Sequence, residues 1–363
     1  MWASKNTHTP ILHYSHTNQP SIITLVLKAM QASPHIICVL NPMAGSGIAL
    51  QRWPKIAALL ESFHISYELL AAQDVSPDVQ VSRRLEQNGP ERYAAIAGIG
   101  GDGTHSAVIN GLMRYRAAHA DQVLPPYVLI PMGTGNDMAK SFGLTARDDF
   151  FVGDLRRAVA AIRYGADYWL DLGCLDGVYF VNALTVGLDS HILREHNRLK
   201  QGVSSLPLMR RILKGNLLYS WCVGQRFWRQ KPLKAEIAID GRPWYAGPII
   251  NLVINNTRNY GGEFVICPDA YANDGLLDVV VFTGHTDYLA KYFLAFRNQP
   301  RRIQELAERL NKVSAYARGQ RIEVRLSRPE AAQYDGEEWP ASDRFQVRVA
   351  PHALHLKIPA EPG

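Results

Sequence analysis

The sequence is poor in cysteine. Its four cysteines lie far apart, and no CxxC motif occurs. A structural zinc site needs closely spaced ligands and a small secreted fold needs paired cysteines, so both classes are disfavoured. We therefore expect a protein of a reducing compartment, with Cys38 buried in a strand as a small apolar side chain.

Long apolar runs are also missing. A membrane-spanning helix needs about 20 apolar residues, whereas the best candidate, residues 22–30, is short and contains Lys28. This segment lacks a basic leader and a small-residue cleavage site, so a secretory signal is disfavoured and a cytoplasmic protein is expected. Residues 1–34 are polar and predict a flexible N-terminal extension, while a natural start at Met30 remains open.

Three common ligand-binding signatures are absent. There is no GxxxxGK[ST] sequence and no GxGxxG at the first strand-to-helix turn. A Walker-type site and a standard dinucleotide site are therefore disfavoured. The histidines form neither HxxxH nor HExxH, which argues against a metal site built from histidine.

The remaining composition is that of an ordinary folded protein. Of its 363 residues, 47% are hydrophobic and 20% are charged, and this length favours two domains. The formal charge is +6 and the isoelectric point about 9.1. A mild basic excess favours phosphates, nucleic acid or an acidic membrane surface as partners, without choosing among them.

Strand-like and helix-like segments alternate in the first half of the chain. The predicted strands are residues 35–40, 67–70, 93–99 and 127–130. The predicted helices are residues 51–63, 79–87, 105–116 and 137–142. This alternation predicts a doubly wound, mainly parallel α/β domain over residues 35–167.

The pattern changes near residue 168 to short strands separated by Asp-Gly turn signals. The predicted strands are residues 178–184, 235–239, 249–254, 277–282, 321–326 and 345–349. We expect an antiparallel, β-sandwich-like domain over residues 168–349, interrupted by helices near 206–229 and 288–310. The C-terminal segment 350–363 is expected to pack back onto the α/β domain.

Three glycine-rich loops each follow a predicted strand and precede a predicted helix. They are residues 41–47 (NPMAGSG), 100–104 (GGDGT) and 131–137 (PMGTGND). The carboxyl ends of parallel strands are where such folds bind ligands. Glycine lets backbone N–H groups approach an anion, and the helix that follows adds a favourable field. Any one loop could be a simple turn, but three at one sheet edge predict a phosphate site.

Asp102 and Asp137 lie at the ends of two of these loops. A carboxylate beside a phosphate is repelled unless a cation lies between them, and magnesium commonly takes that place. The alternative is that each aspartate caps its helix. The magnesium role is favoured for Asp102, and both readings remain open for Asp137.

The loops, in this order and spacing, resemble the diacylglycerol kinase catalytic-domain family, which includes bacterial lipid kinases and relatives of sphingosine and ceramide kinases. Residues 267–278 (CPDAYANDGLLD) and 334–337 (YDGE) fit the same family. GGDGT alone also occurs in NAD kinases and phosphofructokinases, but the five segments together are more specific. The resemblance runs from residue 35 to the C-terminus and implies a phosphofructokinase- or NAD kinase-like nucleotide domain followed by the β-rich lipid-substrate domain.

The resemblance also assigns roles to individual residues. Glu337 corresponds to the general base with Asp335 in support, and Asp102 to an aspartate–water–magnesium network. Asp274 and the backbone carbonyls of Tyr271 and Leu276 correspond to a structural magnesium site. The residues implied at ATP are Asn41, Pro42, Met43, Ala44, Gly45, Gly101, Asp102, Gly103, Thr104, Gly133, Thr134, Gly135, Asn136 and Asp137.

Some positions depart from the family pattern. The family usually follows GGDGT with an apolar residue, Asn and Glu, whereas this chain has His105, Ser106 and Ala107. Ala72 stands where a threonine usually contacts the nucleotide, so we expect that contact to be lost. These departures keep open a catalytically silent lipid- or nucleotide-binding protein on the same fold.

Residues 194–234 are strongly basic. They contain ten lysines and arginines against one acid, Glu195, with apolar residues between them. This pattern suits an interfacial helix on an anionic membrane, although an ordinary amphipathic helix with a solvated basic face remains the alternative. No recognition motif indicates nucleic-acid binding, so no nucleic-acid partner is expected.

The leading hypothesis is an ATP- and Mg²⁺-dependent lipid kinase, peripheral at the inner membrane face, that phosphorylates a hydroxyl of a lipid such as diacylglycerol. An NAD kinase is the nearest enzyme alternative, but GTGND and DGE fit lipid kinases better. Exposed strand edges of the β-rich domain are compatible with a homodimer. The identity of the lipid is open.

Overall fold

A computed structural model describes residues 34–71, 75–133, 135–144, 155–204, 216–261, 264–295, 309 and 312–360. Several sequence predictions concern residues outside these ranges. They are the predictions for residues 1–33, Ala72, Thr134 and 205–215, and for the greater part of the second predicted helix, 288–310.

The first half is built on four parallel strands. In spatial order these are β2 (Ser66–Ala71), β1 (His35–Leu40), β3 (Ala95–Gly100) and β4 (Tyr127–Pro131). The central strands are buried on both faces, which is why they appear in the sequence as continuous apolar runs. The helices of this half are α2 (Ile48–Ser62), α3 (Pro77–Asn88), α4 (Asp102–Ala118), α5 (Asp137–Ser141) and α6 (Leu155–Tyr164). The predicted parallel α/β arrangement is confirmed.

The second half is an antiparallel array. Its main path is β14 (Ala315–Gly319), β13 (Leu277–Phe282), β10 (Asn251–Asn255), β7 (Ala183–Gly187), β15 (Arg321–Tyr334) and β16 (Glu337–Ile358). The hairpin of β8 (Leu233–Ile239) and β9 (Arg242–Ile249) continues from β15. A short separate pair is formed by β11 (Asn259–Tyr260) and β12 (Phe264–Val265). The predicted β-rich class of this half is confirmed.

Two cores lie on opposite faces of this array. Leu252 and Ile254 of β10 join the apolar core between the strands, whereas Val253 joins the core under the helices. This follows from the two-residue period of a strand. The helices in this half are α7 (Leu188–Ser204), α9 (Asn216–Phe227) and α10 (His285–Ala295). No helix in the described ranges is both long and apolar enough to cross a membrane.

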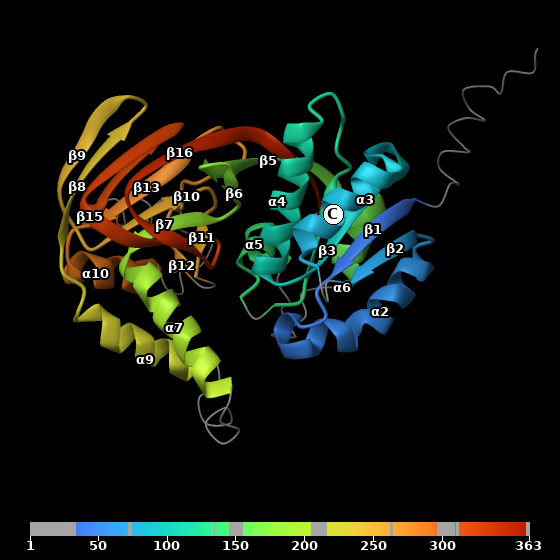
Figure 1. The fold of residues 1–363 in the computed structure, drawn as a ribbon, viewed down its shortest axis with the longest axis horizontal. Coiled ribbons are helices and arrows are strands. Elements are labelled where there is room, and N and C mark those ends of the chain that lie inside the picture. The colour runs from blue at the N-terminus through green and yellow to red at the C-terminus, as the bar shows by residue number, and fades with distance from the viewer. Residues whose placement is uncertain are drawn as a thin grey trace, which may run out of the picture. The chain divides into compact units, whose positions relative to one another are not determined.

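Strand β16 joins the two halves (Figure 1). It has 22 residues; its beginning pairs with β15, and the remainder pairs with β5 (Ala166–Leu175). Near its end, Leu356 also pairs in parallel with Tyr127 of β4. The sequence predicted only residues 345–349 of this strand, because only there do buried and exposed residues alternate regularly.

The predicted single strand 178–184 is wrong. The chain instead forms β6 (Val178–Phe180) and β7, with an interruption between them. In the interruption, the N–H groups of Val181 and Asn182 bond to the carboxylate of Asp335 at 2.6 and 2.8 Å. Because these donors turn to a side chain, they do not serve a continuous strand ladder.

A second buried carboxylate, Asp171 in β5, holds a bulge in β16 to a neighbouring loop. It accepts the N–H of Gly275 at 2.6 Å and the N–H of His352 at 2.7 Å. His352 has a φ of 47° within the bulge, so its amide points out of the ladder. The carboxylate satisfies two backbone donors that have no strand partner.

We predict that Asp171→Ala lowers the free energy of unfolding by about 2 kcal/mol, because it leaves the two donors without an acceptor. Chemical denaturation measures this change. The control Asp343→Ala removes an exposed carboxylate from β16 and should alter stability by less than about 0.5 kcal/mol. Equal stability of the two variants would contradict the assigned role of Asp171.

Candidate active site

The three glycine-rich loops meet at the carboxyl ends of β1, β3 and β4. The N–H of Met132 bonds to the carbonyl of Gly100 at 2.6 Å. A Cβ atom on Gly133 would lie 2.5 Å from the Cα of Gly101. A Cβ atom on Gly45, whose φ is +59°, would lie 2.5 Å from the carbonyl oxygen of Met132. These backbones approach so closely that only glycine fits.

Side chains also link the first two loops. Asn41 donates from Nδ2 to Oγ1 of Thr104 at 3.0 Å, and its Oδ1 accepts the N–H of Met43 at 3.0 Å. Thr104 and Pro42 are buried, whereas the Met43 side chain is exposed. The predicted nucleotide residues of these loops therefore comprise a fixed framework and an exposed tip.

Asp102 connects the second loop to the third. Its Oδ1 accepts the N–H of Met138, at the start of α5, at 3.0 Å. Burial raises the pKa of Asp102, opposed by hydrogen bonds from backbone amides of residues 136–138 and by the charge of Lys140. The sequence analysis did not identify Lys140 as a residue of this site. Its position three residues after Asp137 on a predicted helix could have indicated that its charge lies near these carboxylates.

Neither aspartate occupies the N-cap position of its own helix. The N-cap residues are Gly101 for α4 and Asn136 for α5, and neither of them forms a side-chain cap hydrogen bond with its own helix. Asn136 instead exchanges hydrogen bonds with the backbone of Gly133, both at 2.8 Å. The capping interpretation therefore fails for both, because each aspartate lies one position inside its helix.

Asp335 and Gly336 form the tight turn between β15 and β16. Their φ angles of 44° and 85° are those of a two-residue turn with left-handed backbone. Glu337 follows at the start of β16, and a Cβ atom on Gly103 would lie 2.7 Å from its Oε1. The turn thus brings Glu337 against the first residues of α4, beside Asp102.

The carboxylate of Asp335 is occupied by backbone amides. Besides Val181 and Asn182, the N–H of Ala183 donates to it at 3.1 Å. Burial raises the pKa of Asp335 to about 6, and the charge of Asp102 adds to the shift. Asp335 therefore supports Glu337 by fixing the turn, since its oxygens bind the loop before β7.

Two features of its surroundings raise the pKa of the Glu337 carboxyl group. The side chain is exposed, but nearby protein atoms remove water from part of the carboxylate and raise its pKa, and the charge of Glu338 raises it further. With Asp102 and Asp335, three carboxyl groups near the glycine-rich loops have raised pKa values. Such a site favours a ligand that brings a cation.

The expected magnesium site around Asp274 has another cation beside it. One oxygen of Asp274 pairs with Arg318, and the other accepts the N–H of Leu276 at 3.1 Å. The carbonyl of Tyr271 accepts the N–H of Asp274 at 3.4 Å. Arg318 also lies 3.2 Å from the buried Asp278. Thus placed, these residues do not fit a magnesium ion, and no sequence signal linked Arg318 to them.

No cluster of three or more His, Cys, Asp or Glu side chains that could form a metal cage occurs within the described ranges.

The residues that depart from the family pattern lie largely in the core. His105 is buried and its Nδ1 lies 2.7 Å from the hydroxyl of Tyr127. Burial lowers its pKa to about 4, so the imidazole is neutral near pH 7. Ser106 is also buried, while Ala107 is half-buried. His105 therefore packs between α4 and the sheet, away from the loop surface.

Comparison with known proteins identifies both halves. Residues 35–163 match the diacylglycerol kinase catalytic domain. Residues 197–358 match the YegS C-terminal NAD kinase beta sandwich-like domain.

Curated relatives match over most of their length. A diacylglycerol kinase of Bacillus subtilis is 23% identical over 89% of this chain and 96% of its own. A protein of Stenotrophomonas maltophilia named probable lipid kinase YegS-like is 29% identical over 79% of this chain and 88% of its own.

The fold also matches a solved structure. The crystal structure of a diacylglycerol kinase from Bacillus anthracis is 17% identical, with a TM-score of 0.62 over 90% of this chain and 97% of the other.

We predict that Gly133→Ala lowers the free energy of unfolding by about 1–3 kcal/mol, because its new methyl group meets the backbone of Gly101 and forces two loops apart. Thermal unfolding measures the change. Gly284→Ala is the matched control, since nothing lies within 4 Å of its Cβ position and its φ is not positive. A Gly133→Ala protein as stable as this control would disprove the close packing of the loops.

Proposed function

Because the chain belongs to the family of lipid kinases that carry the diacylglycerol kinase catalytic domain, we propose that it transfers the γ-phosphoryl group of ATP to a hydroxyl of a membrane lipid such as diacylglycerol. The observation that carries this proposal is the contact of Glu337 with the start of α4. It unites a carboxylate from the β-rich half with the glycine-rich loops of the other half.

The loops supply the phosphate site in this proposal. Backbone N–H groups at Gly45 and Gly101 attract phosphate oxygens in this proposal, whereas the N–H of Gly133 is bonded to Oδ1 of Asn136 and holds the third loop in shape. Asn41 and Thr104 hold the first two loops in register through their mutual hydrogen bond. The protein thereby fixes the position of the phosphates before transfer, which is the main requirement of phosphoryl transfer.

The acidic groups fit magnesium that arrives with ATP. Such an ion needs one or two carboxylates in addition to phosphate oxygens and water, and Asp102 lies beside the loops. When bound, magnesium neutralises the phosphate charge. Asp102 would hold it through water, and Asp274 takes no part.

Glu337 is the proposed general base. The oxygen of the lipid hydroxyl bonds to the γ-phosphorus as the bond from that phosphorus to the β–γ bridging oxygen breaks. ADP leaves with that electron pair, and the hydroxyl proton passes to the carboxylate of Glu337. The pKa of Glu337, raised by burial and by Glu338, makes it a better proton acceptor than an ordinary glutamate.

The basic segment 194–234 is proposed to face an anionic membrane. In its described part, the charged residues Arg198, Arg229, Lys231 and Lys234 are accompanied by Trp228, which is 77% exposed. An exposed indole beside cations suits the headgroup region of a bilayer. The kinase would reach its substrate without extracting it into water.

We predict that Glu337→Gln lowers the rate of label transfer from γ-labelled ATP to lipid by about 10²–10⁴-fold, because the amide cannot accept the proton. Mixed micelles with a panel of lipids, and NAD as a separate acceptor, give the measurement. Glu323→Gln, a change elsewhere on β15, is the control and should retain activity. Labelled NAD would instead indicate an NAD kinase, and no transfer by the folded wild type would indicate a silent binding protein.

The pH dependence should report the same group. Protonated Glu337 accepts no proton, so kcat/KM should fall as the pH drops through its pKa, which lies above the ordinary value of 4.5. Glu338→Gln removes a like charge that raises this pKa, so the acidic limb of the profile should move to lower pH. An unmoved limb would exclude Glu337 as the titrating group.

A further inference from the structure

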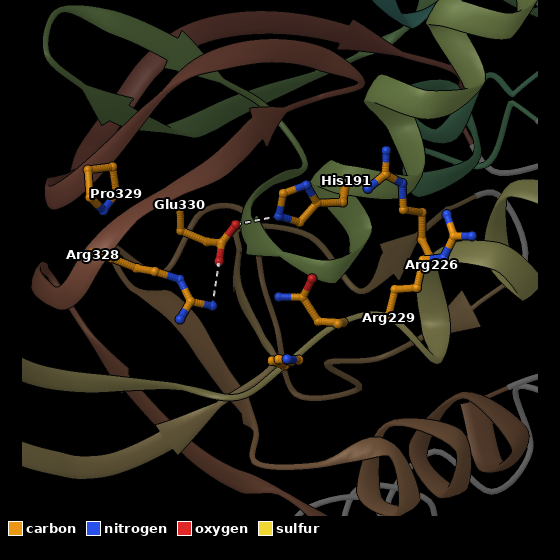
Figure 2. A pocket seen from close by; sticks show the side chains of 8 residues that line it. His191, Arg226, Arg229, Arg328, Pro329 and Glu330 are labelled. Carbon is orange, nitrogen blue, oxygen red and sulfur yellow. Dashed lines mark hydrogen bonds and ion pairs between the residues drawn. The ribbon is translucent and has the colours of Figure 1, made fainter.

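A pocket with a volume of about 380 Å³ opens in the β-rich half, between α7, the end of α9 and a bulge in β15. Figure 2 shows Glu330 between His191 and Arg328, with Arg226 and Arg229 on the facing side. None of these elements carries a glycine-rich loop. The pocket lining contains none of the residues proposed to act in phosphate transfer.

The charge of the one acidic side chain in the lining, Glu330, is balanced by neighbouring residues. Glu330 is 5% exposed, pairs with His191, and lies 3.9 Å from Arg328. Burial works to raise the pKa of Glu330, but hydrogen bonds from His191 and from the amide of Ala331 outweigh it, so the pKa is lowered. Glu330 remains ionised and serves as an internal partner for the surrounding cations.

The other cations leave an excess of positive charge. Arg226 bonds to Glu195 at 2.6 Å. The side chains of Arg229 and Lys231 are exposed and form no hydrogen bond or close ion pair with the described residues, and the side chain of Arg328 is itself 53% exposed. Cations from two separate segments, 226–231 and 328–330, thus converge in the lining, and two of them, Arg229 and Lys231, have no acidic partner within the described ranges.

Gln230 provides a second, independent indication of a ligand. It lines the pocket and is only 8% exposed, yet its Nε2 has no hydrogen-bond partner among the described residues. A buried amide donor normally has an acceptor, because leaving it unpaired is costly. Its place among arginines indicates that the missing acceptor is an anion.

We propose that this pocket binds the phosphate group of a phosphate ester. Arg229, Lys231 and Arg328 supply the charge, and Gln230 donates a directed hydrogen bond to a phosphate oxygen. Phosphate suits this lining because it carries negative charge and several acceptor oxygens, which arginine engages in pairs. The volume leaves room for the group esterified to the phosphate, as in an anionic phospholipid, and this goes beyond a general attraction of the basic segment to membranes.

The test measures binding by the full chain in two arms. Calorimetry with inorganic phosphate at constant ionic strength detects a free ligand. Cosedimentation with phosphatidylcholine vesicles, with and without phosphatidic acid, detects a lipid headgroup. Arg328→Gln should weaken binding about 10-fold, since it removes a charged donor. Gln230→Leu, which leaves the charge unchanged, should weaken it about fivefold.

Arg325→Gln is the matched control. Arg325 lies on the same strand, and its exposed side chain forms no hydrogen bond or close ion pair with the described residues. Its replacement by glutamine changes the net charge by the same amount as Arg328→Gln. It should leave binding within about twofold of the wild type, since it lies outside the pocket. Circular dichroism of each variant establishes that the fold is retained.

Each outcome decides the proposal. If Arg328→Gln and Gln230→Leu weaken binding of inorganic phosphate and Arg325→Gln does not, the ligand is a free phosphate compound. If the same two variants weaken binding only to vesicles that contain phosphatidic acid, the ligand is a lipid headgroup. Equal weakening by Arg325→Gln and Arg328→Gln, with Gln230→Leu unchanged, would reduce the site to a basic surface and overturn the proposal. Absence of binding by the wild type in both arms would overturn it as well.

Discussion

Three backbone N–H groups of residues 181–183 point at one carboxylate, that of Asp335. They lie in the interruption between β6 and β7, and Asp335 opens the turn between β15 and β16. These hydrogen bonds therefore hold the turn against the segment between β6 and β7. Two further hydrogen bonds support the turn: the N–H of Asp335 donates to the carbonyl of Ala183 at 3.0 Å, and the N–H of Gly336 donates to Oε1 of Gln333 at 2.9 Å. Glu337, which follows, is thereby placed at the start of β16.

The turn matters because it meets the other half of the molecule. Glu337 contacts α4 at Gly103, and the neighbouring Asp102 binds the first amides of α5. Burial raises the pKa of Asp335, and the charge of Asp102 adds to the shift. A site that gathers negative charge beside phosphate-binding loops needs a cation for its ligand, and ATP supplies one.

The sequence was sufficient for features encoded locally. The central strands of the α/β half are continuous apolar runs because both faces are covered, and the glycines of the loops reflect close backbone contacts. Strand β16 was largely missed because it changes partners along its length. Arg318, which pairs with Asp274 from 44 residues away, was missed because the pairing exists only in the folded chain. The basic pocket was missed for the same reason, because its lining residues come from α7, the end of α9 and β15, which meet only in the folded chain.

The most direct test of the central claim is the steady-state kinetics of Gly103→Ala. Its new methyl group would meet only the mobile end of the Glu337 side chain, so the fold should persist while the carboxylate is displaced. A displacement of about 1 Å predicts a kcat reduced roughly 100-fold, with little change in KM for ATP. An unchanged kcat would show that the contact between Glu337 and α4 does not position the catalytic base.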